Sequence, residues 1–189
     1  MTVTIRSATP GDAAAIARVR IAGWRTAYRG IVPDAYLDAM QEEPSAAMWE
    51  RVLAAGSNTV SVFVATDADE VIGFAASNRL SEPKHGMDSE LTAIYLLPPW
   101  RRSGVGHRLV QEAVRTQRAR GASGMIAWAL ARNRAGRAFF ERLGGELLVE
   151  QPFEWDGMEL FEAGYAFRDL DALVARCNDW PAAAPGTLH

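Results

Sequence analysis

The stretch Glu90-Leu-Thr-Ala-Ile-Tyr-Leu-Leu-Pro-Pro-Trp-Arg-Arg-Ser-Gly-Val-Gly106 combines the signals of a strand, a glycine-containing turn and the start of a helix. Residues 90–97 are rich in β-branched, aromatic and apolar side chains, and the two prolines end the strand because they have no backbone N–H to donate. The two glycines let a ligand approach the backbone closely, and the first N–H groups of the following helix are free to bind an anion. We therefore predict that an anionic group binds at this turn.

The composition of the chain is that of an ordinary globular protein. Its 189 residues are 49% apolar and 23% charged, which suits one well-buried core. We predict a single domain over residues 1–180, followed by a flexible tail at 181–189 that is rich in Ala, Pro and Gly. The net charge of −3 comes with scattered basic residues, so nothing in the composition indicates nucleic-acid binding.

Cysteine usage and the N-terminus bear on the cellular compartment. Cys177 is the only cysteine, which excludes an internal disulfide framework and a multi-cysteine metal site, and we predict no bound metal. The first residues lack the apolar core of a signal peptide, and no run approaches the roughly 18 apolar residues of a membrane span. We expect a cytoplasmic protein that does not bind membranes.

Hydrophobic periodicity and turn signals predict the elements on either side of the opening stretch. Strands are expected at 2–8, 61–66, 71–77, 90–97, 124–130, 146–151 and 159–167; helices are expected at 9–24, 105–121, 133–143 and 169–177. The aromatic-rich region after residue 24 is interrupted by Gly30 and Pro33, which suggests two or three short helices. Residues 80–87 are expected to form a loop. This order predicts a mixed α/β sheet with helices on both faces.

Two common nucleotide-binding motifs do not match the glycine turn. A Walker P-loop requires a lysine directly after its last glycine, and His107 follows Gly106 here. A dinucleotide-binding turn requires a third glycine, and Leu109 stands in its place.

Arg101-x-x-Gly104-x-Gly106 instead resembles the motif Gln/Arg-x-x-Gly-x-Gly/Ala of the GCN5-related N-acetyltransferase (GNAT) superfamily. Glu90-Leu-x-x-Ile-Tyr-Leu-x-Pro is similar to the central strand of that family, and Asn133 with Phe139-Phe-Glu-Arg-Leu-Gly144 is similar to its second cofactor segment. Ile5-Arg-x-Ala-Thr-Pro-Gly-Asp12 and Trp24-x-x-Ala-Tyr-x-Gly30 resemble the start of many members, so the likeness covers about residues 3 to 167. It implies a single-domain, mostly antiparallel central sheet of about seven strands.

The resemblance also implies acetyl-CoA as co-substrate. In the family, N–H groups of the turn hold the pyrophosphate, and the backbone of the central strand pairs with the pantetheine arm. The positions that correspond to the turn are Arg101, Arg102, Ser103, Gly104, Val105 and Gly106. The strand positions are Ile94 and Leu96. Asn133 would reach the arm from the second segment, and it is equally suited to capping the helix that follows it.

The family's reaction is direct attack of an amine on the thioester, and Glu90 is the candidate base. By strand alternation we expect Glu90 on the same face as Thr92 and Ile94. An unperturbed Glu, with a pKa of about 4.3, is about 8 kcal/mol too weak to take a proton directly from an alkylammonium with a pKa of about 10.4. We therefore expect Glu90 to act through a water chain or to bind the ammonium, and a plain surface carboxylate at the strand end is the alternative.

The proton donor for the leaving thiolate is a departure from the family. Many members have a tyrosine seven residues after the asparagine, and Phe140 occupies that place here. Tyr95, Tyr165 or a bound water could replace it, or the thiolate, with a pKa near 8.5, could leave without help. The sequence does not choose among these.

The acceptor is expected to be a primary amine on a small molecule or a peptide, with Trp24, Tyr28 and Tyr36 as candidate walls of its pocket. These rings are equally consistent with an ordinary core. The alternative to an enzyme is an acetyl-CoA-binding sensor or interaction module with little catalysis, for which Phe140 would be the sign. The many aromatic residues outside the motif are compatible with a homodimer.

Overall fold

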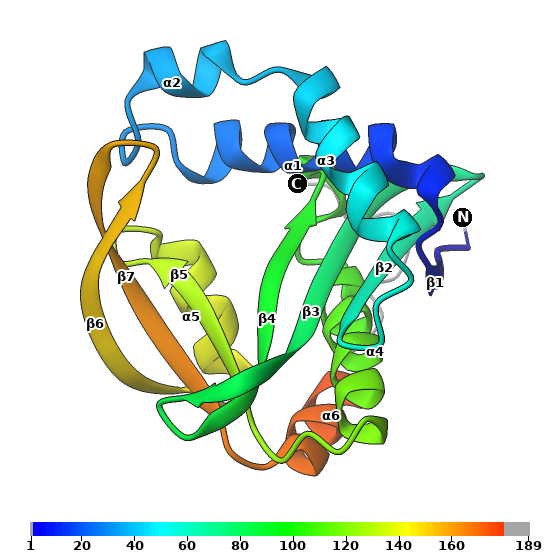
Figure 1. Cartoon of the computed structure of the whole chain (residues 1–189), viewed down its shortest axis with the longest axis vertical. Coiled ribbons are helices and arrows are strands. Elements are labelled where there is room, and N and C mark those ends of the chain that lie inside the picture. The colour runs from blue at the N-terminus through cyan, green and yellow to red at the C-terminus, as the bar shows by residue number, and fades with distance from the viewer. Residues whose placement is uncertain (1, 180–189) are drawn as a thin grey trace.

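The computed structural model describes residues 2–179 (Figure 1). The strands are β1 Thr4–Ser7, β2 Val60–Asp67, β3 Glu70–Lys84, β4 Met87–Leu96, β5 Met125–Leu130, β6 Glu146–Trp155 and β7 Met158–Phe167. The helices are α1 Ala13–Ala27, α2 Asp34–Ala39, α3 Glu42–Ala54, α4 Val105–Ala119, α5 Arg134–Arg142 and α6 Leu170–Asn178, with 3-10 turns at Pro10–Asp12 and Pro98–Trp100. The predicted tail at 181–189 lies outside the described residues.

The strands form one seven-stranded sheet in the order β1-β2-β3-β4-β5-β7-β6. Every neighbouring pair is antiparallel except β4 and β5, which are parallel. Helices cover both faces, because one core cluster joins the sheet to α4, α5 and α6 and a second joins it to α1 and α3. The predicted fold class is therefore confirmed.

The parallel pair separates after three residues. Ser89, Glu90 and Leu91 pair with Met125, Ile126 and Ala127, and the rest of β4 and β5 has no partner across the gap. Figure 1 shows the two strands close together at the lower end of the sheet and diverging toward α1. An unpaired strand edge inside a protein leaves backbone N–H and C=O groups that require other partners. The gap is therefore a place where a ligand can add backbone-like hydrogen bonds.

The predicted loop at residues 80–87 is wrong for most of its length. β3 continues to Lys84, which pairs with Met87 across a two-residue turn at His85 and Gly86. Both turn residues have positive φ, as this kind of tight hairpin turn requires. Pro83 is tolerated because an irregularity in the register lies between Arg79 and Lys84.

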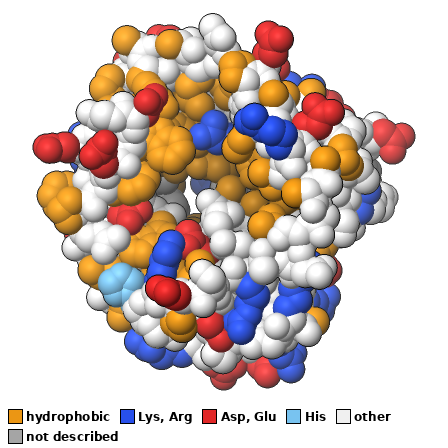
Figure 2. Space-filling view, in the orientation of Figure 1, with side chains coloured by type: hydrophobic (Ala, Val, Ile, Leu, Met, Phe, Trp, Pro, Cys, Tyr) orange, Lys and Arg blue, Asp and Glu red, His pale blue; other side chains and the backbone are white. Residues whose placement is uncertain are grey.

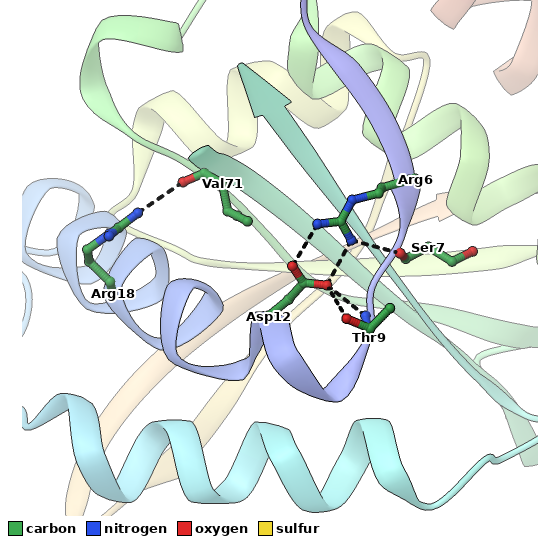
Figure 3. A network of polar contacts seen from close by, with 6 residues as sticks. All are labelled: Arg6, Ser7, Thr9, Asp12, Arg18 and Val71. Atoms are coloured by element: carbon green, nitrogen blue, oxygen red, sulfur yellow. Dashed lines mark hydrogen bonds and ion pairs between the residues drawn. The ribbon is translucent and has the colours of Figure 1, made fainter. Parts of the chain in front are cut away.

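A polar network holds the start of α1, as Figure 3 shows. The Asp12 carboxylate accepts from the Thr9 backbone N–H at 2.7 Å and from both guanidinium NH groups of Arg6 at 2.8 Å. These bonds to the charged form lower the pKa of Asp12 to about 2, with the Arg6 hydrogen bond as the largest cause. The Thr-Pro-Gly-Asp helix start expected from the sequence is present: Thr9 is the N-cap and Pro10–Asp12 form a 3-10 turn that leads into α1.

In residues 2–179, none of the helices combines the length and apolar character needed to cross a membrane.

Candidate active site

The turn after β4 presents free backbone amides at the start of α4. Gly104, with φ 86°, is the helix N-cap, and Arg102 also has a positive φ of 62°. The Arg108 N–H donates to the Gly104 carbonyl at 3.2 Å, whereas the amides of residues 102–106 have no acceptor among the described residues. Free N–H groups together with the positive end of the helix dipole favour an anion here.

Three arginines surround this turn. Arg101, Arg102 and Arg142 line a cavity of about 440 Å³ together with Gly104 and Gly106. His107 also lines the cavity, and burial, reinforced by the charge of Arg142, lowers the pKa of His107 to about 4. The positive charge at neutral pH therefore comes from the arginines and not from the histidine.

The unpaired edge of β4 continues this cavity into the gap. The Leu97 N–H donates to the Ile72 carbonyl of β3 at 2.9 Å. Because backbone groups of successive residues alternate between the two sides of a strand, those of Ile94 and Leu96 face the gap toward β5. The side chain of Arg101 reaches back to the Leu96 carbonyl, with Nε at 3.4 Å.

A second cavity of about 300 Å³ occupies the gap and shares five residues with the first. The shared residues are Leu96, Arg101, Gly106, Ala135 and Phe139. We call the two cavities together the long groove. It brings together most of the residues that the sequence predicted for the cofactor: Ile94, Leu96, Arg101, Arg102, Gly104, Gly106 and Asn133 line it. The side chains of Ser103 and Val105 do not, because the Ser103 hydroxyl donates to the Trp100 carbonyl at 2.6 Å and Val105 is buried in the core. Asn133 also caps α5, since its Oδ1 accepts from the Gly136 N–H at 3.0 Å.

A further cavity of about 300 Å³, which we call the side cavity, opens beside the groove. Its walls are mostly apolar: Trp24, Tyr28, Met48, Trp49, Tyr95, Trp128, Leu130, Phe153, Trp155 and Leu160. Arg20 and Glu162 are the charged residues that line it. Of the predicted acceptor residues, Trp24 and Tyr28 line the side cavity. Tyr36 stands behind it and accepts a hydrogen bond from the Trp155 Nε1–H at 2.8 Å.

The groove and the side cavity meet at residues that line both: Tyr28, Thr92, Ala93, Tyr95, Trp128 and Ala129. Figure 2 shows a hollow near the middle of this face, with hydrophobic side chains along much of its rim, basic side chains above it, and both acidic and basic side chains below it. A ligand in the groove can therefore contact a ligand in the side cavity through this junction.

Glu90 does not lie where strand alternation predicted. The register with β3 shifts at a bulge near Thr92, and as a result Leu91 and Ile94 pack into the same core cluster. Glu90 is on the opposite face from Leu91, so the expectation that it shares a face with Ile94 is wrong. Its carboxylate pairs with the Lys84 Nζ at 2.9 Å and lines neither the groove nor the side cavity.

Glu162 is the carboxylate that the sequence reasoning missed. It is opposite Leu130 in the β5–β7 register and accepts from Gln151 Nε2 at 2.9 Å. Burial and, to a smaller degree, the negative charge of Glu90 raise the pKa of Glu162, while Gln151 and Lys84 oppose the shift. The sequence contained a signal for Glu162. Every second residue of β7 faces the same side, and Glu162 is an acidic residue that follows the apolar Met158 and Leu160 in this series.

Comparison with known proteins identifies the family. The model of the acetyltransferase (GNAT) family matches residues 22–145. A relative from Bacillus subtilis (strain 168), the uncharacterized N-acetyltransferase YuaI, is 33% identical over 177 residues, which are 93% of this chain and 99% of the relative.

Two solved structures share the fold. The PaiA N-acetyltransferase of Thermoplasma acidophilum, in complex with coenzyme A, superposes with a TM-score of 0.70 at 19% identity, covering 86% of this chain and 98% of that one. The putative acetyltransferase yncA of Salmonella typhimurium, with acetyl-CoA, has a TM-score of 0.66 at 22% identity, covering 89% and 94%. The family model and the B. subtilis relative both span most of the chain, and the chain therefore belongs to the acetyltransferase (GNAT) family.

Proposed function

We propose that this acetyltransferase transfers the acetyl group of acetyl-CoA to a primary amine by direct attack. The observation that carries the proposal is the junction where the long groove meets the side cavity at the unpaired end of β4 and β5. Bound acetyl-CoA supplies the thioester carbonyl that the amine attacks.

The residues of the long groove fit acetyl-CoA. The free amides of Arg102, Ser103, Gly104, Val105 and Gly106 suit the pyrophosphate, and Arg101, Arg102 and Arg142 supply positive charge. The gap-facing backbone of Ile94 and Leu96 suits the amide groups of a pantetheine arm. Asn133 keeps its amide nitrogen for a ligand, because only its oxygen is used in capping α5.

The side cavity is the proposed acceptor site. Its aromatic walls, with Trp24 and Tyr28 in contact with the acceptor and Tyr36 in support, suit an apolar body. Glu162 provides a carboxylate for the ammonium group. We therefore propose that the acceptor is a primary amine on a mainly apolar molecule.

The amine must lose a proton before it attacks, and two carboxylates serve this step in our proposal. Glu162 lines the cavity and receives the ammonium. Glu90 stands behind it as a proton relay through water, since its charge acts on Glu162 and its own carboxylate is held by Lys84. This arrangement avoids the unfavourable direct transfer from an alkylammonium to one carboxylate.

Thiol release tests the proposal. The protein is mixed with acetyl-CoA and, in turn, 2-phenylethylamine, butylamine and a lysine-containing peptide, and free CoA thiol is followed with time. The alcohols of the same shape are matched controls, because they cannot become ammonium ions. We expect amines to raise thiol release above background and 2-phenylethylamine to be the best of the three. If calorimetry shows that acetyl-CoA binds but no amine raises thiol release, the chain is an acetyl-CoA-binding sensor or interaction module instead.

A further inference from the structure

Phe140 occupies the position where many members of the family have a tyrosine that gives a proton to the leaving thiolate, and Phe140 cannot do so. Phe140 is 5% exposed and packs against the rings of Phe139, Tyr165 and Phe167. A phenyl ring has no exchangeable proton. Another group must take this part if the thiolate is protonated by the protein.

The chain has four tyrosines, and two of them are excluded by their surroundings. The Tyr165 hydroxyl donates to Glu141 Oε1 at 2.8 Å, accepts from Arg137 Nε at 3.0 Å, and does not line the groove. Tyr36 lines neither the groove nor the side cavity, and its hydroxyl accepts from Trp155. Both hydroxyls are therefore separated from the junction.

The remaining two tyrosines meet at the junction. Tyr28 is the C-cap residue of α1 and Tyr95 is on β4, and their hydroxyl oxygens are 3.3 Å apart. Both line the long groove and the side cavity. The hydroxyl of Thr92, which is also at the junction, is already used as a donor to the Ala76 carbonyl at 3.1 Å.

The hydrogen bonds of the pair leave one hydroxyl proton for a ligand. Either hydroxyl can donate to the other across this distance. When Tyr95 donates to Tyr28, the Tyr28 O–H is free to donate to a ligand. Burial raises the pKa of both phenols, and the charge of Arg20 opposes this only in part, so both remain protonated at neutral pH.

We propose that the Tyr28 hydroxyl donates a proton to the CoA sulfur as the carbon–sulfur bond breaks, with Tyr95 as its positioning residue. This inference rests on the proposed function. The ammonium loses one proton to water through Glu162 and Glu90 before the attack, and the amine nitrogen then forms the new bond to the acetyl carbon and loses a second proton to water. Tyr28 gives one proton to sulfur and regains one from water through Tyr95. The balance is one ammonium and one acetyl-CoA converted into one amide, one CoA thiol and one proton released to water.

Replacing Tyr28 with phenylalanine tests the proposal by two readouts. With saturating amine, we expect kcat to fall by about 10²-fold, the effect of losing one general acid, with no change in the KM for acetyl-CoA. Tyr165→Phe is the matched control and should keep its kcat. Thermal melting of each variant shows whether it folds.

The second readout does not depend on turnover. A donor to the sulfur stabilises the thiolate and therefore lowers the pKa of the bound CoA thiol below its free value of about 8.5. Calorimetric binding experiments between about pH 7 and pH 10 compare CoA with desulfo-CoA, which has no thiol. Tyr95, Glu162 and Arg20 face both ligands, so the difference between the two affinities isolates the effect of the thiol. In the wild-type chain the preference for CoA should grow as the pH rises, and in Tyr28→Phe this growth should be lost.

Retention of both kcat and the pH-dependent preference in a folded Tyr28→Phe would overturn the proposal. If that variant does not fold, Tyr95→Phe serves in its place: a smaller fall in kcat and a weaker pH-dependent preference support the proposal, and wild-type behaviour overturns it. A wild-type chain that acetylates no amine would refute the proposed function alone, because the CoA titrations would still report on the Tyr28 hydroxyl.

Discussion

Replacing Gly106 with valine, which is larger than the glycine or alanine that the family motif accepts at this position, should weaken CoA binding. The backbone of Gly106 is helical, and an added Cβ would lie 3.4 Å from Leu96 Cδ1 and 3.5 Å from Phe139 Cε2, which are ordinary contacts. Valine is also a slightly better helix former than glycine. Because its two methyl groups extend beyond this Cβ, the fold of the variant is checked directly.

The valine side chain would occupy the long groove, because Gly106 lines both of its cavities. An extra methyl in a close-packed contact typically costs about 1–3 kcal/mol. If CoA packs against Gly106, its Kd should rise by about 5- to 150-fold. Isothermal titration calorimetry with CoA measures this change, and a thermal melt measures the stability.

Gly11→Val is the matched control for this substitution. Its Cβ would lie 3.7 Å from Thr9 Oγ1, in the turn before α1, and Gly11 does not line the groove. We expect this variant to bind CoA like the wild-type chain. Wild-type affinity in a folded Gly106→Val would show that the ligand does not approach the start of α4, and the assignment of the groove would be refuted.

Three further predictions concern charged side chains. Asp12→Asn should reduce the free energy of unfolding at pH 7 by about 2 kcal/mol, because the pKa of Asp12 is about 2 in the folded chain and 3.8 in the unfolded chain. The stabilisation by the ionised Asp12 is present above pH 3.8 and is lost as the pH falls toward 2. Glu162→Gln should lower kcat/KM for a cationic amine by about 10- to 100-fold, the range expected for a lost charge-assisted contact. Arg142→Ala should weaken CoA binding by about 2- to 10-fold and reduce the salt dependence of that binding, because the exposed arginine contributes a screened charge.

The measurements and controls for these variants differ. Urea unfolding at several pH values checks Asp12→Asn, and a gap to the wild-type chain that persists unchanged at about pH 2 would contradict the reasoning. Glu159→Gln, an exposed neighbour on β7, is the control for Glu162→Gln, and equal kinetics of the two would exclude Glu162 from the acceptor site. Calorimetry at low and high salt checks Arg142→Ala, for which an unchanged salt dependence is the contrary result.

The sequence predicted the parts of the fold that local chemistry determines. The prolines ending β4 and the glycines opening α4 are turn signals with a direct physical cause, and the seven strands followed from periodicity. The length of β3 could not be predicted, because Ser81–Lys84 is polar and contains a proline, and its strand conformation depends on pairing with β4. Local propensity is overridden by such long-range pairing.

The candidate site was predicted in part for the same reason. Residues of the glycine turn are close in sequence and were found together, but the bulge near Thr92 changes the faces of β4 and moves Glu90 away from the expected place. Glu162 and the contact between Tyr28 and Tyr95 depend on strands and helices far apart in the chain. A single sequence does not show which distant residues come together. The one indication was an acidic residue at a strand position where apolar residues alternate.

The most direct test of the central claim is the fate of the acetyl group itself. The full chain is incubated with acetyl-CoA carrying an isotopically labelled acetyl group and with 2-phenylethylamine, and the products are identified by mass spectrometry. We predict that the label appears in the N-acetylated amine, only when both protein and amine are present. Label that stays in acetyl-CoA, or is released only as acetate, while CoA binding is intact, would contradict the account.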